Sequence, residues 1–151
     1  MTKALTLIGF DFGEKRIGVA VGQTLTGTAT PLETIPALAG IPDWNRIARL
    51  IQQWRPQALI VGEPLNMDGT KQEITATATG FADELRRRFA LPVMLADERL
   101  SSYEARQRLK DTYHLDPVAA QAILETWLSE HSSLPDNDAT ISKSASNAKS
   151  R

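Results

Sequence analysis

The chain has 151 residues, which is enough for one domain with a hydrophobic core and too few for two ordinary domains. Hydrophobic residues make up 42% and charged residues 23%, and the formal net charge is −1, so a strongly basic protein that coats nucleic acid is excluded. Cysteine is absent, which excludes disulfides, thiolate metal ligands and cysteine nucleophiles and fits a reducing compartment. The N-terminus reads as a strand and no window is long enough to span a membrane, so a soluble cytoplasmic protein is expected.

The first part of the chain predicts three strands in a meander and then a helix. Apolar runs indicate two strands that are joined by a turn at Gly13–Lys15, and a third, weaker strand follows. Asp43 is a good N-cap, and apolar residues recur after it at the spacing of an amphipathic helix. The expected segments are strands at 4–12, 16–22 and 28–35 and a helix within 42–54.

The second part predicts two buried strands that alternate with helices. The runs ALIVG (58–62) and PVMLA (92–96) are short and apolar, as in strands of a parallel sheet. Three helix starts are expected from their capping patterns, namely the pairs Thr70 with Glu73 and Ser101 with Glu104 and the dipeptide Asp116–Pro117. From about residue 132 the sequence is polar and free of aromatic residues, so we expect one domain at 1–131 and a disordered tail at 132–151.

This order of elements predicts an α/β fold with a mixed sheet, in which an antiparallel hairpin extends a parallel portion. In such sheets ligands gather at the carboxyl ends of the parallel strands. Acidic residues follow or end the predicted strands and open the last helix, at Asp11, Glu63, Asp97, Glu98 and Asp116. Carboxylates that are forced together repel unless a cation neutralises them, and ligands that are all oxygen favour Mg²⁺ or Mn²⁺ over zinc. Hydrolysis of a phosphodiester bond is the chemistry that such a cluster favours.

Three ordered motifs, GFDFGEKRIGVAVG, VGEPLNMDGT and DERLSSYEA, resemble the YqgF family of the RNase H-like superfamily over residues 4 to about 130. Members of that family are described as pre-16S rRNA nucleases and as Holliday-junction resolvase-like proteins. The resemblance implies an RNase H-like sheet of five strands, the first three antiparallel, with helices on both faces. It also implies metal ligands at Asp11, at Glu98 with Asp97 beside it, and at Asp116. Glu63 stands where the family usually has an apolar residue, so it is either a fourth ligand or a loop residue that faces water.

Each of these acids also has a purely structural explanation. Asp11 could cap a turn, Glu98 could pair with Arg99, and Asp116 could serve only as the N-cap of its helix. Asp97 and Glu98 point to opposite sides of a strand, so only one of them aims easily at the cluster. Candidates for contact with substrate phosphates or nucleotides are Lys15, Arg16, Asn66, Arg99, Ser101 and Ser102.

The sequence therefore predicts a metal-dependent endonuclease that acts on structured RNA and processes the 5′ end of pre-16S rRNA in ribosome maturation, with a ribosomal particle as a partner and no membrane. One alternative is a resolvase of branched DNA, which would need a dimer to make two symmetric cuts. Another is a nucleic-acid-binding or regulatory module without catalysis. The length of the chain disfavours an actin-like sugar kinase, because that fold needs two such domains. A monomer or a weak homodimer is expected.

Overall fold

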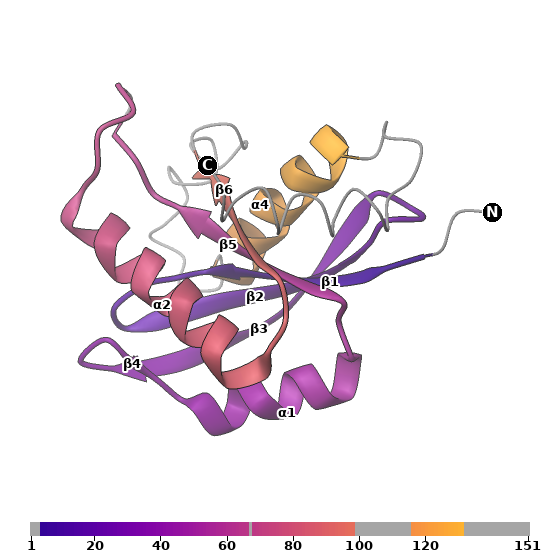
Figure 1. The fold of residues 1–151 in the computed structure, drawn as a ribbon, viewed down its shortest axis with the longest axis horizontal. Coiled ribbons are helices and arrows are strands. Elements are labelled where there is room, and N and C mark those ends of the chain that lie inside the picture. The colour runs from indigo at the N-terminus through magenta and orange to yellow at the C-terminus, as the bar shows by residue number, and fades with distance from the viewer. Residues whose placement is uncertain (1–3, 67, 99–115, 132–151) are drawn as a thin grey trace.

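A mixed sheet of six strands runs through the computed structural model, which describes residues 4–66, 68–98 and 116–131 (Figure 1). Its strands are β1 (Thr6–Asp11), β2 (Arg16–Gln23), β3 (Thr28–Leu38), β4 (Ile41–Pro42), β5 (Ala58–Glu63) and β6 (Val93–Asp97). The helices of the described residues are α1 (Trp44–Trp54), α2 (Glu73–Phe89) and α4 (Asp116–His131). The helix start that was predicted at Ser101, and the tail at 132–151, lie outside the described residues.

The strands lie in the order β4-β3-β2-β1-β5-β6. β1 to β4 pair antiparallel in sequence, and β5 and β6 extend the sheet parallel to β1. The RNase H-like fold class that was predicted is confirmed, but the strand count of five is wrong. The additional strand is β4, which has only two residues. It pairs with Ala37 and Leu38 at the end of β3, and β3 is longer than expected.

Two hydrophobic layers enclose the sheet. α1 and α2 cover one face and α4 covers the other (Figure 1). Successive side chains of a strand point to opposite faces, so β1 sends Ile8 and Phe10 toward α1 and α2 and sends Leu7 toward α4. Because β1 and β5 are central and covered on both faces, their sequences are nearly continuous apolar runs. Within the described residues, none of the helices has the length and apolarity that crossing a bilayer requires.

The helix starts agree with the sequence in two cases and differ in one. α1 is capped by Asp43 and α4 begins at Asp116, as expected. The capping box predicted for Thr70 is wrong, because Thr70 donates both its N–H and its hydroxyl to Asp68 inside the preceding loop. α2 begins at Glu73 instead, and the backbone N–H of Gln72 donates to Thr75 Oγ1 over 2.9 Å.

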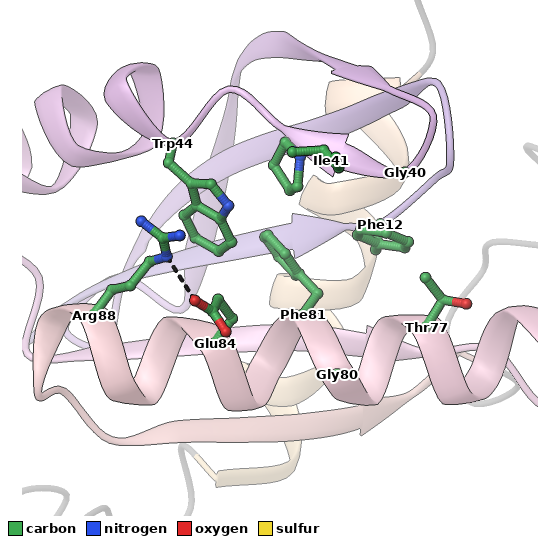
Figure 2. Close-up of a pocket in the computed structure, with 10 residues that line it drawn as sticks. Phe12, Gly40, Ile41, Trp44, Thr77, Gly80, Phe81, Glu84 and Arg88 are labelled. Atoms are coloured by element: carbon green, nitrogen blue, oxygen red, sulfur yellow. Dashed lines mark hydrogen bonds and ion pairs between the residues drawn. The ribbon is translucent and has the colours of Figure 1, made fainter.

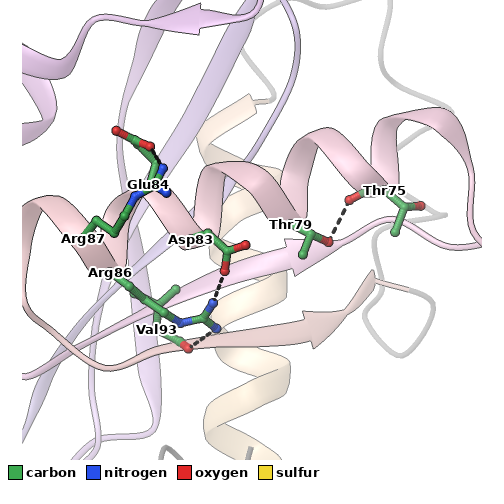
Figure 3. Close-up of polar contacts among 7 residues, drawn as sticks. All are labelled: Thr75, Thr79, Asp83, Glu84, Arg86, Arg87 and Val93. Carbon is green, nitrogen blue, oxygen red and sulfur yellow. Dashed lines mark hydrogen bonds and ion pairs between the residues drawn. The ribbon is translucent and has the colours of Figure 1, made fainter. Parts of the chain in front are cut away.

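The arginine run near the end of α2 pairs with acids one turn earlier (Figure 3). Arg86 contacts Asp83 at 2.5 Å and also donates to the carbonyl of Val93 over 2.8 Å, which ties the helix to β6. Arg87 and Arg88 both donate to Glu84. The hydrogen bond from Arg87 is the main cause that holds the pKa of the Glu84 carboxyl below its usual range.

The outer edge of β3 is covered by side chains of α4. Gln121 Nε2 donates to the backbone oxygen of Ala29 over 2.9 Å, and the backbone N–H of Ala29 donates to Glu125 Oε2 over 3.2 Å. These two contacts satisfy both backbone polar groups of Ala29 on the side away from β2.

Candidate active site

Asp11 ends β1 and points to the face that α4 covers. Its side chain follows Leu7 and Gly9 in the alternation of the strand, and a Cβ on Gly9 would lie 3.1 Å from Leu124 of α4. Only 8% of Asp11 is exposed, so its carboxylate is largely removed from water at the end of the strand. A carboxylate in that position is costly unless other groups or a cation compensate it.

Asp116 is brought next to Asp11 by a glycine. Asp11 pairs with Gly18 of β2, and a Cβ on Gly18 would lie only 1.9 Å from the backbone oxygen of Asp116. Any side chain at Gly18 would therefore collide with the first residue of α4. The missing Cβ lets α4 begin directly on β2, the strand next to the one that carries Asp11. Neighbouring strands lie about 4.8 Å apart.

Glu98 is brought to the same face by a second glycine. Glu98 follows β6 and is 6% exposed. A Cβ on Gly62 would lie 2.8 Å from Glu98 Oε2 and 2.6 Å from Ile123 of α4, so the carboxylate lies over the end of β5 beneath that helix. Phe10 pairs with Val61 in the parallel pair β1–β5, so Gly62 stands beside Asp11 one residue further along. Glu98 and Asp116 thus approach Asp11 from its two neighbouring strands.

Glu63 and Asp97 are directed to the opposite face. They pair with each other in the register of β5 and β6, and both are partly buried. Gly62 and Ala96, which precede them, lie on the side of α4, so the alternation of the strands turns Glu63 and Asp97 toward the side of α1 and α2. The five predicted acids therefore divide into three on one face and two on the other.

The three acids on the face of α4 are carboxylates, the donor type that suits Mg²⁺ or Mn²⁺. The glycines opposite two of them leave the room that these acids occupy, which a Cβ would fill. In the conformation described, no three Asp, Glu or His side chains of residues 4–66, 68–98 and 116–131 are grouped closely enough to hold an ion. The carboxylate of Asp116 is bound instead by Arg16, whose Nε donates to Oδ2 over 2.7 Å.

The other predicted substrate residues have different surroundings. Lys15 and Arg16 are exposed where the β1–β2 turn enters β2, next to the acids. Asn66 is also exposed, but its amide nitrogen donates to the hydroxyl of Thr70 over 2.9 Å and so closes its own loop. The remaining candidates, Arg99, Ser101 and Ser102, lie outside the described residues.

A pocket of about 390 Å³ opens on the opposite face, between α2 and the β3–β4 hairpin (Figure 2). Trp44 and Phe81 line it and stack with their ring centroids 5.6 Å apart, and the guanidinium of Arg88 lies 4.2 Å from the centre of the Trp44 ring. Phe12, the neighbour of Asp11, also lines it. None of its lining residues is a site residue that the sequence predicted, and its stacked aromatic rings are packed as core.

Two features of the site were missed by the sequence reasoning. The steric role of Gly62 could have been suspected only from its position one residue before the end of a buried strand. The pairing of Arg16 with Asp116 joins residues that lie 100 positions apart, for which the sequence carries no local signal.

Comparison with known proteins agrees with this architecture. A Legionella pneumophila (strain Paris) protein described as "Putative pre-16S rRNA nuclease" is 53% identical over 131 residues, which cover 82% of this chain and 94% of the relative. A protein of the same description from Aeromonas salmonicida (strain A449) is 49% identical over 133 residues, 83% of this chain and 95% of the relative. The solved Fowlpox virus resolvase in complex with Holliday junction DNA shares the fold, with a TM-score of 0.51 at 14% identity, over 83% of this chain and 98% of that chain. Residues 5–130 match the RuvX family, described as Holliday junction resolvase, and the chain belongs to that family.

Proposed function

We propose that this protein is a metal-dependent nuclease that hydrolyses phosphodiester bonds in structured RNA, with the precursor of 16S rRNA as its substrate. The observation that carries this proposal is the placement of Asp11, Glu98 and Asp116 on the same face of the sheet, around the end of β1. Relatives that are about half identical over most of their length are described as nucleases of that RNA, which supports the choice of substrate.

Asp11, Glu98 and Asp116 would hold the cation, which we propose is Mg²⁺ or Mn²⁺. When bound, the ion would supply an activated water and would stabilise the negative charge that develops at phosphorus. The protein contributes the positions of the ligands. Asp11 and Glu98 are buried at the strand ends, and Asp116 is fixed by the packing of α4 on Gly18. The burial of Asp11 and Glu98 also limits the water that competes for the site.

We further propose that residues 1–131 form the nuclease domain and that the protein acts in the cytoplasm, where it would meet the rRNA precursor in an assembling ribosomal particle. Lys15 and Arg16 are placed to contact the RNA backbone beside the acids, since both are exposed at the start of β2. Arg99, Ser101 and Ser102 remain candidates for the same role from the sequence alone.

The test replaces Asp11 with Asn in the full chain. We expect cleavage of a pre-16S rRNA fragment that carries its 5′ extension to fall by at least about 100-fold, the upper end of what loss of an outer-shell partner of a metal costs. The melting temperature should stay equal or rise, because one of three mutually repelling carboxylates is gone. Asp83→Asn on α2 is the matched control, since it removes an exposed acid far from the strand ends. An Asp11→Asn protein that is folded and cleaves at the normal rate would refute the proposal.

A second candidate substrate is branched DNA, which the description of the matching family favours. A four-way DNA junction assayed in parallel with the rRNA fragment separates the two substrates. Sedimentation of the protein with the junction adds an independent criterion, because two symmetric cuts require two active sites in one assembly. Cleavage of the junction by a dimer, with no cleavage of the RNA, would favour the second candidate.

A further inference from the structure

Arg16 lies beside the proposed metal ligands and is bound to one of them. The Arg16 Nε and Asp116 Oδ2 atoms are 2.7 Å apart, and the side chains are 51% and 16% exposed respectively. Arg16 is two residues before Gly18 on β2, so both face α4. A guanidinium therefore stands at the strand ends where Asp11 and Glu98 are buried.

The backbone of Asp116 is held in place independently of this ion pair. Its carbonyl lies against Gly18, and the helix that it opens packs against β1, β2 and β3 through Leu124 and its neighbours. Asp116 can therefore change partner by rotating its side chain, without any movement of α4. With its backbone fixed, Asp116 can pair with Arg16 in one side-chain orientation and take another partner in a different one.

We propose that Arg16 is a displaceable counter-ion of the metal site. Its guanidinium neutralises and orients Asp116 before a divalent cation binds, and the cation displaces it from that carboxylate. This inference rests on the proposed function, since it requires Asp116 to be a metal ligand. It makes Arg16 a positioning residue that acts through Asp116.

The physical reason is a competition for the same oxygens. Without a cation, three carboxylates on one face repel one another, and the positive charge of Arg16 reduces that repulsion. A cation that binds Asp116 must break the charge-assisted hydrogen bond from Arg16 and also meets the like charge of the guanidinium. Arg16 therefore stabilises the metal-free protein and weakens its affinity for the cation.

The experiment measures Mn²⁺ binding to the full chain by calorimetry, with Arg16→Gln as the variant. We expect Mn²⁺ to bind to Arg16→Gln about fivefold more tightly than to the wild type, because the variant lacks one exposed ion pair and one like charge. The melting temperature without metal should fall, and the difference from the wild type should shrink at saturating Mn²⁺. A gain in affinity is a result that damage to the fold would not produce. Arg16→Lys keeps the charge but loses the Nε hydrogen bond, so its affinity should lie between the two.

Arg46→Gln is the matched control. Arg46 Nε lies 2.7 Å from Glu33 Oε2, and the two side chains are 45% and 29% exposed, so this ion pair has the same length and a similar exposure. It joins α1 to β3 on the other side of the sheet from α4. Its loss should leave the affinity for Mn²⁺ unchanged.

The outcomes separate this inference from the proposed function. If the wild type binds Mn²⁺ and Asp11→Asn does not, but Arg16→Gln binds it with normal or weaker affinity, the counter-ion role is refuted and the proposed function stands. If the wild type binds no Mn²⁺, both fail. Should circular dichroism show that Arg16→Gln does not fold, Arg16→Lys takes its place, and an affinity no higher than that of the wild type overturns the inference.

Discussion

At the scale of single residues, Asp11 and Glu98 are carboxylates that the fold buries at strand ends, on the face that α4 covers. Asp11 is 8% exposed and Glu98 is 6% exposed, whereas most carboxylates in proteins lie in water. Such burial is costly, and it is typically found where the charge has a task. The alternation of β5 and β6 places Glu98 on the face of α4 and Glu63 on the other face, whereas the sequence left open whether Glu63 is a further metal ligand or a loop residue that faces water.

A pair of substitutions tests this separation. Glu98→Gln should lower the rate of RNA cleavage by at least about 100-fold, because it removes a carboxylate oxygen from the face of α4. Glu63→Gln should keep the rate within about threefold of the wild type, because its side chain is directed to the other face. Cleavage rates at saturating Mn²⁺ check both expectations. A large loss in Glu63→Gln with little loss in Glu98→Gln would reverse the assignment.

At the scale of the elements, Gly18 and Gly62 let α4 lie close to the sheet. Gly18 and Gly62 each leave room that a neighbour fills, with the backbone of Asp116 over one and the carboxylate of Glu98 over the other. The first contact is the more demanding, because a backbone atom cannot rotate away as the end of a side chain can.

Replacing glycine by alanine should therefore have opposite effects on the free energy of unfolding at Gly18 and at Gly80. Gly18→Ala places a Cβ 1.9 Å from a backbone oxygen and should lower the free energy of unfolding by about 2 to 3 kcal/mol, as overpacking does. Gly80→Ala lies on the exposed side of α2 with nothing within 4 Å, so it should raise that energy by about 0.5 to 1 kcal/mol. Urea unfolding of both variants gives the comparison. A Gly18→Ala protein as stable as the wild type would show that α4 shifts at little cost.

The elements also show how far the sequence could predict the structure. Strong local signals predicted β1, β5 and α1, where apolar periodicity and the cap at Asp43 agree. The two-residue strand β4 has no such signal, because it is defined by its pairing with β3. The spacing of Thr70 and Glu73 predicted a helix cap at Thr70, but its hydroxyl donates to Asp68 in the loop instead. The face that each acid occupies depends on strand register, which the sequence does not state.

At the scale of the whole molecule, the described core ends with α4. Trp127 and Leu128 are the last buried residues of the layer beneath that helix, and the family match ends at residue 130. The ring of His131 stacks on Trp127 with the centroids 3.8 Å apart, and its Nδ1 lies 2.7 Å from the Trp127 carbonyl oxygen. These observations support our proposal that the domain ends at His131.

Truncation after His131 tests this boundary. We expect the shortened protein, 1–131, to keep the melting temperature and the cleavage rate of the full chain on a free RNA fragment, because the removed residues are polar and free of aromatic groups. Thermal unfolding and the RNA assay provide the measurement. A clear loss of stability would place residues 132–151 within the folded unit, and a loss of cleavage alone would assign them to RNA binding.

The contacts of Gln121 and Glu125 with Ala29 bear on how this molecule can associate with copies of itself. The side-chain amide of Gln121 and the carboxylate of Glu125 make the hydrogen bonds that a further strand would make there. The backbone N–H and carbonyl of Ala29 are therefore already bonded and cannot pair with an incoming chain. Growth of the sheet from this stretch of β3 into another molecule would first have to displace these side chains. The same contacts would oppose a dimer that pairs two copies through this stretch of β3.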